Sequence, residues 1–228
     1  SMYQYDDSML TDNRVNLSSL LRYTLMLMIG YIESIMLEKE YAIPWNANIY
    51  TPSQYFMNFI DLLMKGTVVY FIGYIAPKEY DKTKRWYFWF AYIVSVPTFT
   101  LIDEILQIST DEWQLKSLTT YQITFMIIVT IIVLSLSIYH IYLARMISIH
   151  DYRYSIINRN WYRVLYPLSI ISVPIGYMVA MMYVNIEMYW FIFWYLSLFT
   201  QFNTVISIIS QAVSLSIMTN EIANYSLV

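Results

Sequence analysis

TFMIIVTIIVLSLSIYHIYLA, residues 124–144, contains no Asp, Glu, Lys or Arg and is almost entirely apolar. An uncharged apolar stretch of this length is typical of a transmembrane helix, because an α-helix needs about 20 residues to cross the hydrocarbon core of a bilayer. The stretch belongs to a longer apolar run at about 118–144. This run indicates an all-α membrane protein.

The composition of the whole chain agrees with this stretch. Of the 228 residues, 58% are hydrophobic and 13% are charged, whereas soluble domains carry about 25% charged and 45–50% apolar residues. The surplus apolar surface must face lipid or protein. Six apolar runs lie at about 18–37, 55–76, 86–107, 118–144, 160–184 and 188–218. They predict a polytopic membrane helical bundle of six transmembrane helices.

The expected organisation is one transmembrane domain over residues 18–218. A polar N-terminal arm (1–17) precedes it, and a short C-terminal tail (219–228) follows it. The last three runs are longer than a straight span requires, so we expect those helices to tilt, kink or protrude from the bilayer.

Basic residues are divided unequally between the segments that connect the runs. Two of them, Lys39 and Lys116, follow odd-numbered runs, and Lys65 lies within a run. The other ten lie before or at the start of an odd-numbered run: Arg14, Arg22, Lys78, Lys82, Lys84, Arg85, Arg145, Arg153, Arg159 and Arg163. Cytoplasmic segments collect Lys and Arg, so the sequence predicts both termini on the cytoplasmic or matrix side. The membrane is expected to be the plasma membrane or the mitochondrial inner membrane.

Ionisable side chains inside the runs are the first candidates for a site. Asp61 and Lys65 are four residues apart, which places them on one face of a helix. Each charge costs at least about 2.5 kcal/mol at the bilayer centre, so we expect the two to form an ion pair. The pair would serve either a transport site or only the orientation of its helix.

Three further carboxylates, Glu33, Asp103 and Glu104, lie in the first and third runs. With the predicted orientation they fall in the outer half of the bundle, as does Asp61. This placement predicts an acidic outer vestibule, which would concentrate cations and suit proton exchange. In the alternative reading Asp103 and Glu104 lie at the membrane interface and Glu33 has a partner of its own.

Prolines and polar residues mark the later runs. Pro97, Pro167 and Pro174 predict helix kinks, which form either a pathway or only the shape of the bundle. A polar stripe in the last run is expected to face protein or a water-filled cavity. In the alternative reading its side chains only form hydrogen bonds that hold neighbouring helices together. The stripe comprises Gln201, Asn203, Ser207 and Gln211.

The sequence lacks familiar catalytic and metal-binding patterns. There is no cysteine, which excludes disulfides and thiolate sites, and the two histidines, His140 and His150, form no ligand motif. His140 is expected at the inner membrane interface. We predict no catalytic residue, no metal and no cofactor, and the isoelectric point near 5.3 argues against nucleic acid as a partner.

Three classes of function remain. The first is transport of protons, cations or a small solute through a polar intramembrane site. The second is a non-catalytic membrane-embedded subunit of a larger complex, for example an energy-transducing one. The third is an intramembrane enzyme that acts on lipid through the acidic cluster. The expected partners are the lipid bilayer and other membrane protein subunits.

Overall fold

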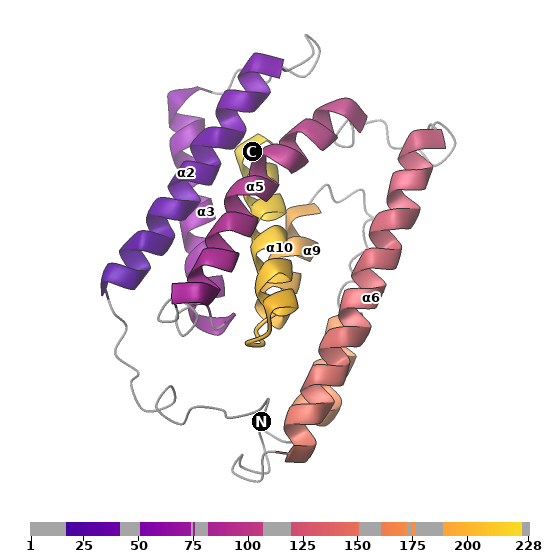
Figure 1. Ribbon diagram of the computed structural model, residues 1–228. Helices are drawn as coiled ribbons and strands as arrows, with labels where there is room; N and C mark the ends of the chain where they lie inside the picture. Colours follow the sequence, from indigo (N-terminus) through magenta and orange to yellow (C-terminus); the bar gives the residue numbers. More distant parts are fainter. Residues whose placement is uncertain are drawn as a thin grey trace.

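The protein is a bundle of helices (Figure 1). The computed structural model describes residues 17–41, 51–73, 75, 82–106, 120–150, 161–172, 175–176 and 189–224, and this part contains no strand. The elements are α2 (Leu17–Tyr41), α3 (Pro52–Ile72), α5 (Lys82–Leu106), α6 (Thr120–His150), the π-helix η1 (Trp161–Leu165), α9 (Tyr189–Phe199) and α10 (Val205–Asn224). The all-helical prediction is confirmed for these residues.

Three helices are long and apolar enough to cross a membrane: Leu17–Glu40, Pro52–Ile72 and Val205–Ala223. A shorter apolar stretch lies at Thr130–Met146 in α6. Large apolar side chains are exposed on the outside of the bundle, for example Ile131, Ile132 and Ile138 on α6. Such a surface is unfavourable in water and suits contact with lipid chains, so the chain has the helices of an integral membrane protein.

The core lies where α2, α3 and α5 pack around α10. Buried side chains from these four helices form one apolar cluster, and α10 contributes Ile208, Ala212, Leu215, Met218 and Ile222. A second, smaller cluster joins α6, the helix after η1 and the residues between α9 and α10. α10 is therefore the central helix, enclosed by protein along most of its length.

The sequence explains how α3 begins and ends. Thr51 is the N-cap, its side chain accepts from the Gln54 amide, and Gln54 Oε1 accepts from the Thr51 amide at 2.8 Å. Pro52 follows at the first helical position, where the absence of its N–H costs nothing. At the other end the Gly73 amide donates to the Val69 carbonyl at 2.8 Å.

The run at 188–218 was predicted to be one helix, but it forms two. α9 ends at Phe199, residues 200–204 are non-helical, and α10 begins at Val205. A continuous helix of this run would be about 46 Å long at 1.5 Å per residue, well beyond the roughly 30 Å core of a bilayer. The chain instead folds back, and α9 and α10 pack side by side as a helical hairpin (Figure 1).

This hairpin changes the expected topology. α10 continues to Asn224, so most of the predicted tail at 219–228 is helix. The helices alternate in direction, and the N-terminal end of α2 and the C-terminal end of α10 lie at opposite ends of the bundle (Figure 1). Both termini were predicted on one side of the membrane; these two helix ends lie at opposite ends of the bundle, and the side of the membrane on which each lies stays a prediction.

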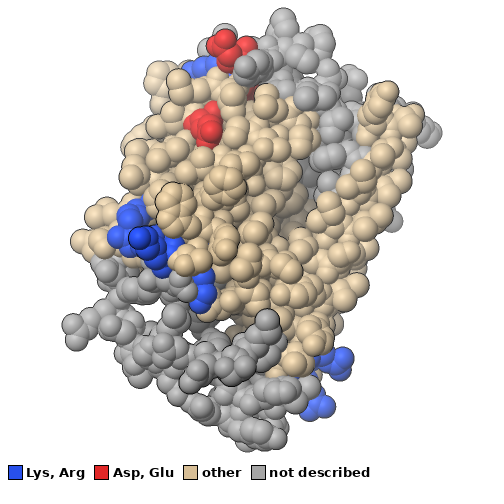
Figure 2. Space-filling view, viewed as in Figure 1, with Lys and Arg blue, Asp and Glu red and all other residues tan. Residues whose placement is uncertain are grey.

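The unequal distribution of basic residues is visible on the surface. Figure 2 shows most of the blue side chains toward one end of the bundle and the red ones toward the other, where a further blue group lies beside them. The end with most of the blue side chains carries the start of α2, the start of α5 and the end of α6 (Figure 1). The described basic residues at that end are Arg22, Lys82, Lys84, Arg85, Arg145 and Arg163. The basic residues that lie outside the described part of the chain are Arg14, Lys78, Lys116, Arg153 and Arg159. We call this end the basic end.

The prolines fall in different settings. Pro97 lies inside α5, which remains helical through it, and Figure 1 shows the second half of α5 turning toward α6. Thr98 donates a side-chain hydrogen bond to the Val94 carbonyl, four residues earlier, and Thr100 Oγ1 lies 3.0 Å from the Val96 carbonyl oxygen. Pro167 follows the π-helix η1 within a helical stretch at 166–172. Pro174 lies outside the described residues.

Candidate functional site

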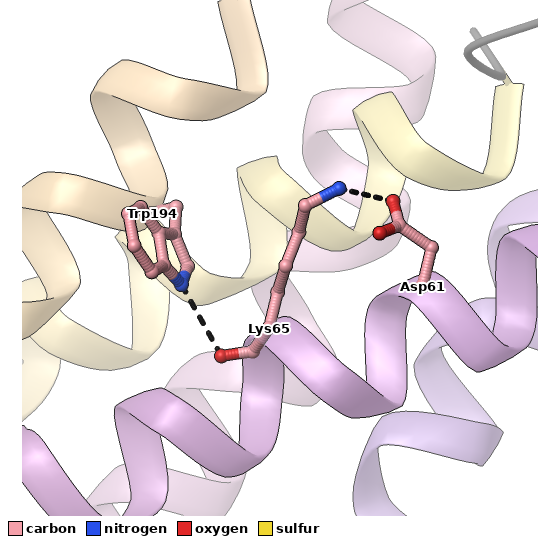
Figure 3. A network of polar contacts seen from close by, with 3 residues as sticks. All are labelled: Asp61, Lys65 and Trp194. Atoms are coloured by element: carbon pink, nitrogen blue, oxygen red, sulfur yellow. Dashed lines mark hydrogen bonds and ion pairs between the residues drawn. The ribbon is translucent and has the colours of Figure 1, made fainter.

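Asp61 and Lys65 form the predicted ion pair on α3 (Figure 3). Their side chains are 32% and 15% exposed, so both are largely withdrawn from the surface. Trp194 of α9 donates its indole N–H to the backbone carbonyl of Lys65 at 3.2 Å. This contact uses the backbone, and it therefore joins α9 to α3 independently of the Lys65 charge.

We expect Asp61→Asn to destabilise the protein by about 2–3 kcal/mol, because it leaves the Lys65 ammonium without its counter-charge. The double variant Asp61→Asn/Lys65→Met should recover most of the loss, since no charge then remains to be compensated and the Trp194 contact is kept. Thermal unfolding in detergent, followed by tryptophan fluorescence, measures both. Equal destabilisation of the single and double variants would contradict the pairing.

Glu33 and Asp61 do not lie at one depth. Tyr23 of α2 donates to the Gly66 carbonyl of α3 at 3.0 Å, and Tyr31 donates to the Tyr55 carbonyl at 2.7 Å. These contacts fix the antiparallel register and place Asp61 level with the stretch of α2 between the two tyrosines. Glu33 therefore lies roughly 10 Å farther from the basic end than Asp61, at 1.5 Å per residue. The structure does not bring these two carboxylates together.

Asp103 and Glu104 belong to the last turns of α5, but their side chains lie outside the described residues. Their helix positions follow Thr100, which shares Asn220 with Ser34 of α2. The backbone of 103–104 lies about one turn beyond the level of Glu33, and a vestibule formed by Glu33, Asp103 and Glu104 without Asp61 stays a prediction.

A buried polar cluster joins α2, α5 and α10 next to Glu33, and we call it the Asn220 cluster. Asn220 Oδ1 accepts hydrogen bonds from Ser34 Oγ at 2.7 Å and from Thr100 Oγ1 at 2.6 Å. One turn away, Tyr92 Oη and Thr219 Oγ1 are 2.9 Å apart, and Thr219 Oγ1 donates to the Leu215 carbonyl. All five residues are at most 2% exposed. The cluster includes two residues that the sequence assigned to a tail.

Glu33 lies at the edge of this cluster. It is half-buried on α2, and its carboxylate interacts electrostatically with the Tyr92 hydroxyl. The Glu33 Oε2 atom is buried and has no hydrogen-bond partner among the residues that the structure describes. A buried carboxylate oxygen without a donor is costly, so a proton or a cation bound there would stabilise it.

The predicted polar stripe is divided by the hairpin. Gln201 and Asn203 lie in the non-helical residues between α9 and α10; Asn203 is exposed, and Gln201 donates to the Tyr162 hydroxyl at 3.3 Å. Ser207 and Gln211 are buried in α10. Gln211 Nε2 donates to the Gly73 carbonyl at 2.7 Å and to the Ser197 carbonyl at 2.8 Å. Gln211 thus joins the ends of α3 and α9 to α10.

Aromatic residues that the sequence analysis did not select hold the end of α9. Tyr166, next to Pro167, donates its hydroxyl to the Phe199 carbonyl at 2.6 Å, and Tyr195 donates to the Ser169 carbonyl at 3.0 Å. The last carbonyls of a helix have no partner within the helix, so Tyr166 satisfies one of them. A buried Tyr beside a proline gives no sequence signal for this role.

No group of three or more potential metal-ligating side chains occurs among the described residues. Comparison with protein-family models, with curated proteins and with solved structures gave no match to this chain.

Proposed function

We propose that this protein moves protons or small cations across its membrane through the polar centre of the bundle, with Glu33 as the group that binds them. The observation that carries the proposal is the buried Glu33 Oε2, which has no hydrogen-bond partner among the described residues. An ionisable group inside a membrane helix usually marks an ion or proton pathway.

The central helix supplies polar groups along its whole length. Buried polar side chains of α10 extend from its first turn to its last: Ser207, Ser210, Gln211, Ser214, Ser216, Thr219 and Asn220. Many of their hydroxyl groups donate to carbonyls of their own helix, as Ser210 and Ser216 do. These groups accept hydrogen bonds as well, so they could solvate a cation or relay a proton between the Asn220 cluster and the hairpin.

The test is a flux measurement in sealed liposomes that contain the purified protein. With a proton or sodium gradient imposed, we expect Glu33→Gln to reduce flux by about tenfold or more, because the neutral amide cannot exchange a proton or balance a cation. Glu40→Gln, on the exposed end of the same helix, is the matched control and should leave flux unchanged. Wild-type rates in Glu33→Gln, or no flux through the wild type for either ion, would refute the proposal.

A second candidate is a membrane subunit of a larger complex. The observation in its favour is α6, which packs mainly against η1 and carries exposed apolar residues along its length. Another subunit could cover this helix as readily as lipid. The native mass of the detergent-solubilised particle from its own membrane distinguishes the two, because a stable excess over protein and detergent favours the subunit.

A further inference from the structure

His140 is fully enclosed at the point where α6 meets the α9–α10 hairpin. It is 1% exposed. Its Nδ1 lies 2.7 Å from the Leu136 carbonyl oxygen, and its Nε2 lies 3.0 Å from Ser207 Oγ. Ser207 Oγ lies 2.9 Å from the carbonyl oxygen of Thr200, the first non-helical residue after α9. These atoms form one chain from α6, through the start of α10, to the end of α9.

The directions of these hydrogen bonds determine how many protons the His140 ring must carry. A carbonyl oxygen only accepts, so His140 Nδ1 must carry a proton for Leu136. The single hydroxyl proton of Ser207 is likewise committed to Thr200. Ser207 Oγ must then accept from His140 Nε2, which requires a second ring proton. All three hydrogen bonds exist together only when the imidazole is doubly protonated.

A neutral ring changes the contact at one place. Nε2 then presents a lone pair, and the Ser207 hydroxyl proton turns toward it. The Thr200 carbonyl then loses its hydrogen bond from Ser207. Thr200 is the first residue of the turn at 200–204, so this hydrogen bond is one that joins the turn to α10. The protonation of His140 is therefore linked to the connection between α9 and α10.

The ionisable residues on the elements that pack around His140 are tyrosines and arginines. α6 itself contributes Tyr139, whose hydroxyl donates to Thr204 Oγ1 at 3.2 Å, and Arg145. The helix that begins with η1 contributes Tyr162, Tyr166 and the exposed Arg163, and α9 contributes Tyr195. Phe202 of the hairpin covers the ring at 5.9 Å between centroids. No carboxylate occurs in the described residues of α6, of 161–172 or of the hairpin up to Asn220.

We infer that His140 is a second proton-binding site, at the opposite end of α10 from the Asn220 cluster, and that its proton controls the hydrogen bond from Ser207 to Thr200. The ligand is the proton itself, and no other group is required. The inference goes beyond the proposed transport, because it holds or fails whether or not the protein conducts.

Nuclear magnetic resonance of the full chain in detergent tests it. The chain has two histidines, so His150→Gln leaves His140 as the single imidazole. Thr200-Gln201 is the one Thr-Gln pair in the sequence, so labelling Thr carbonyls with 13C and Gln amides with 15N reports on the Thr200 carbonyl alone. The signals of the ring nitrogens and of this carbonyl are then followed from about pH 5 to about pH 8, an interval that includes the pKa of a free imidazole, about 6.5.

We expect both ring nitrogens to be protonated at the acidic end, the Nδ1–H tautomer to remain at the alkaline end, and the Thr200 carbonyl signal to move with the ring. In Ser207→Ala the carbonyl signal should no longer follow the ring. The control Ser210→Ala should behave as the parent, since Ser210 donates to Ile206 within α10. A ring that is neutral throughout, an Nε2–H tautomer, or a carbonyl that ignores the ring in the parent would each overturn the inference.

Discussion

Gly30→Leu is expected to lower the free energy of unfolding by about 3 kcal/mol or more, because overpacking a closed contact costs typically 1–3 kcal/mol and here a hydrogen bond is lost as well. A Cβ at Gly30 would lie 2.5 Å from Tyr92 Oη, 2.7 Å from Cε1 and 2.9 Å from Cζ. Tyr92 is fully buried, and its hydroxyl is paired with Thr219. The tyrosine cannot move aside without breaking this pair and separating α2 from α5.

The chain provides a matched control at Gly176. Among the described residues, no atom lies within 4 Å of a Cβ built there, so Gly176→Leu adds the same side chain without a clash with any of them. Leucine also has the higher helix propensity, by about 0.8 kcal/mol, and this gain applies to both variants. Tryptophan fluorescence during thermal unfolding in detergent should show a clear loss for Gly30→Leu and none for Gly176→Leu. Identical midpoints for the two variants would mean that α2 and α5 do not meet at Gly30.

Much of the fold could be predicted from local sequence. Apolar runs identify α2, α3, α5 and α6, since helix length follows from the bilayer requirement. The basic end follows from counting Lys and Arg, and the Asp61–Lys65 pair follows from the four-residue spacing. All of these features depend on residues close together in the chain.

The hairpin is the main feature that was missed. The apolar run at 188–218 continues through the turn, and its length was one sign that it is not a single helix. A second signal was present: Thr204 Oγ1 accepts from the Ser207 amide at 3.3 Å, which is the geometry of a helix N-cap. Thr204 followed by the apolar Val205 is therefore a start signal for α10, whereas the prediction placed both residues inside one continuous span.

The candidate site depends on contacts that no local pattern contains. Thr219 and Asn220 resemble the polar end of a span, and only packing against α2 and α5 buries them. In the sequence His140 is a single histidine with apolar neighbours. Its contact with Ser207 exists only because the chain turns back between α9 and α10. Asp61 and Glu33 differ in depth because of the register between α2 and α3, which tyrosine side chains fix from a distance of 24 and 43 residues.

The other large expected effect concerns the side of the membrane on which α10 ends. The end of α10 lies at the end of the bundle opposite the start of α2 (Figure 1), whereas six spans would place both on one side. α10 is helical to Asn224, so the residues that directly follow it begin at the end of the bundle opposite the start of α2. The two topologies therefore predict reaction of a C-terminal label from opposite sides of the membrane.

Labelling of single cysteines with a membrane-impermeant maleimide measures this directly, because the chain has no cysteine of its own. Lys82→Cys and Arg145→Cys are exposed at the basic end, Glu40→Cys is exposed at the other end, and a fourth variant carries a cysteine appended after Val228. In sealed vesicles of known orientation, the appended cysteine should react from the same side as Glu40→Cys, and Lys82→Cys and Arg145→Cys should react only from the opposite side. Reaction of the appended cysteine from the side of Lys82→Cys would contradict the hairpin and restore a six-span topology.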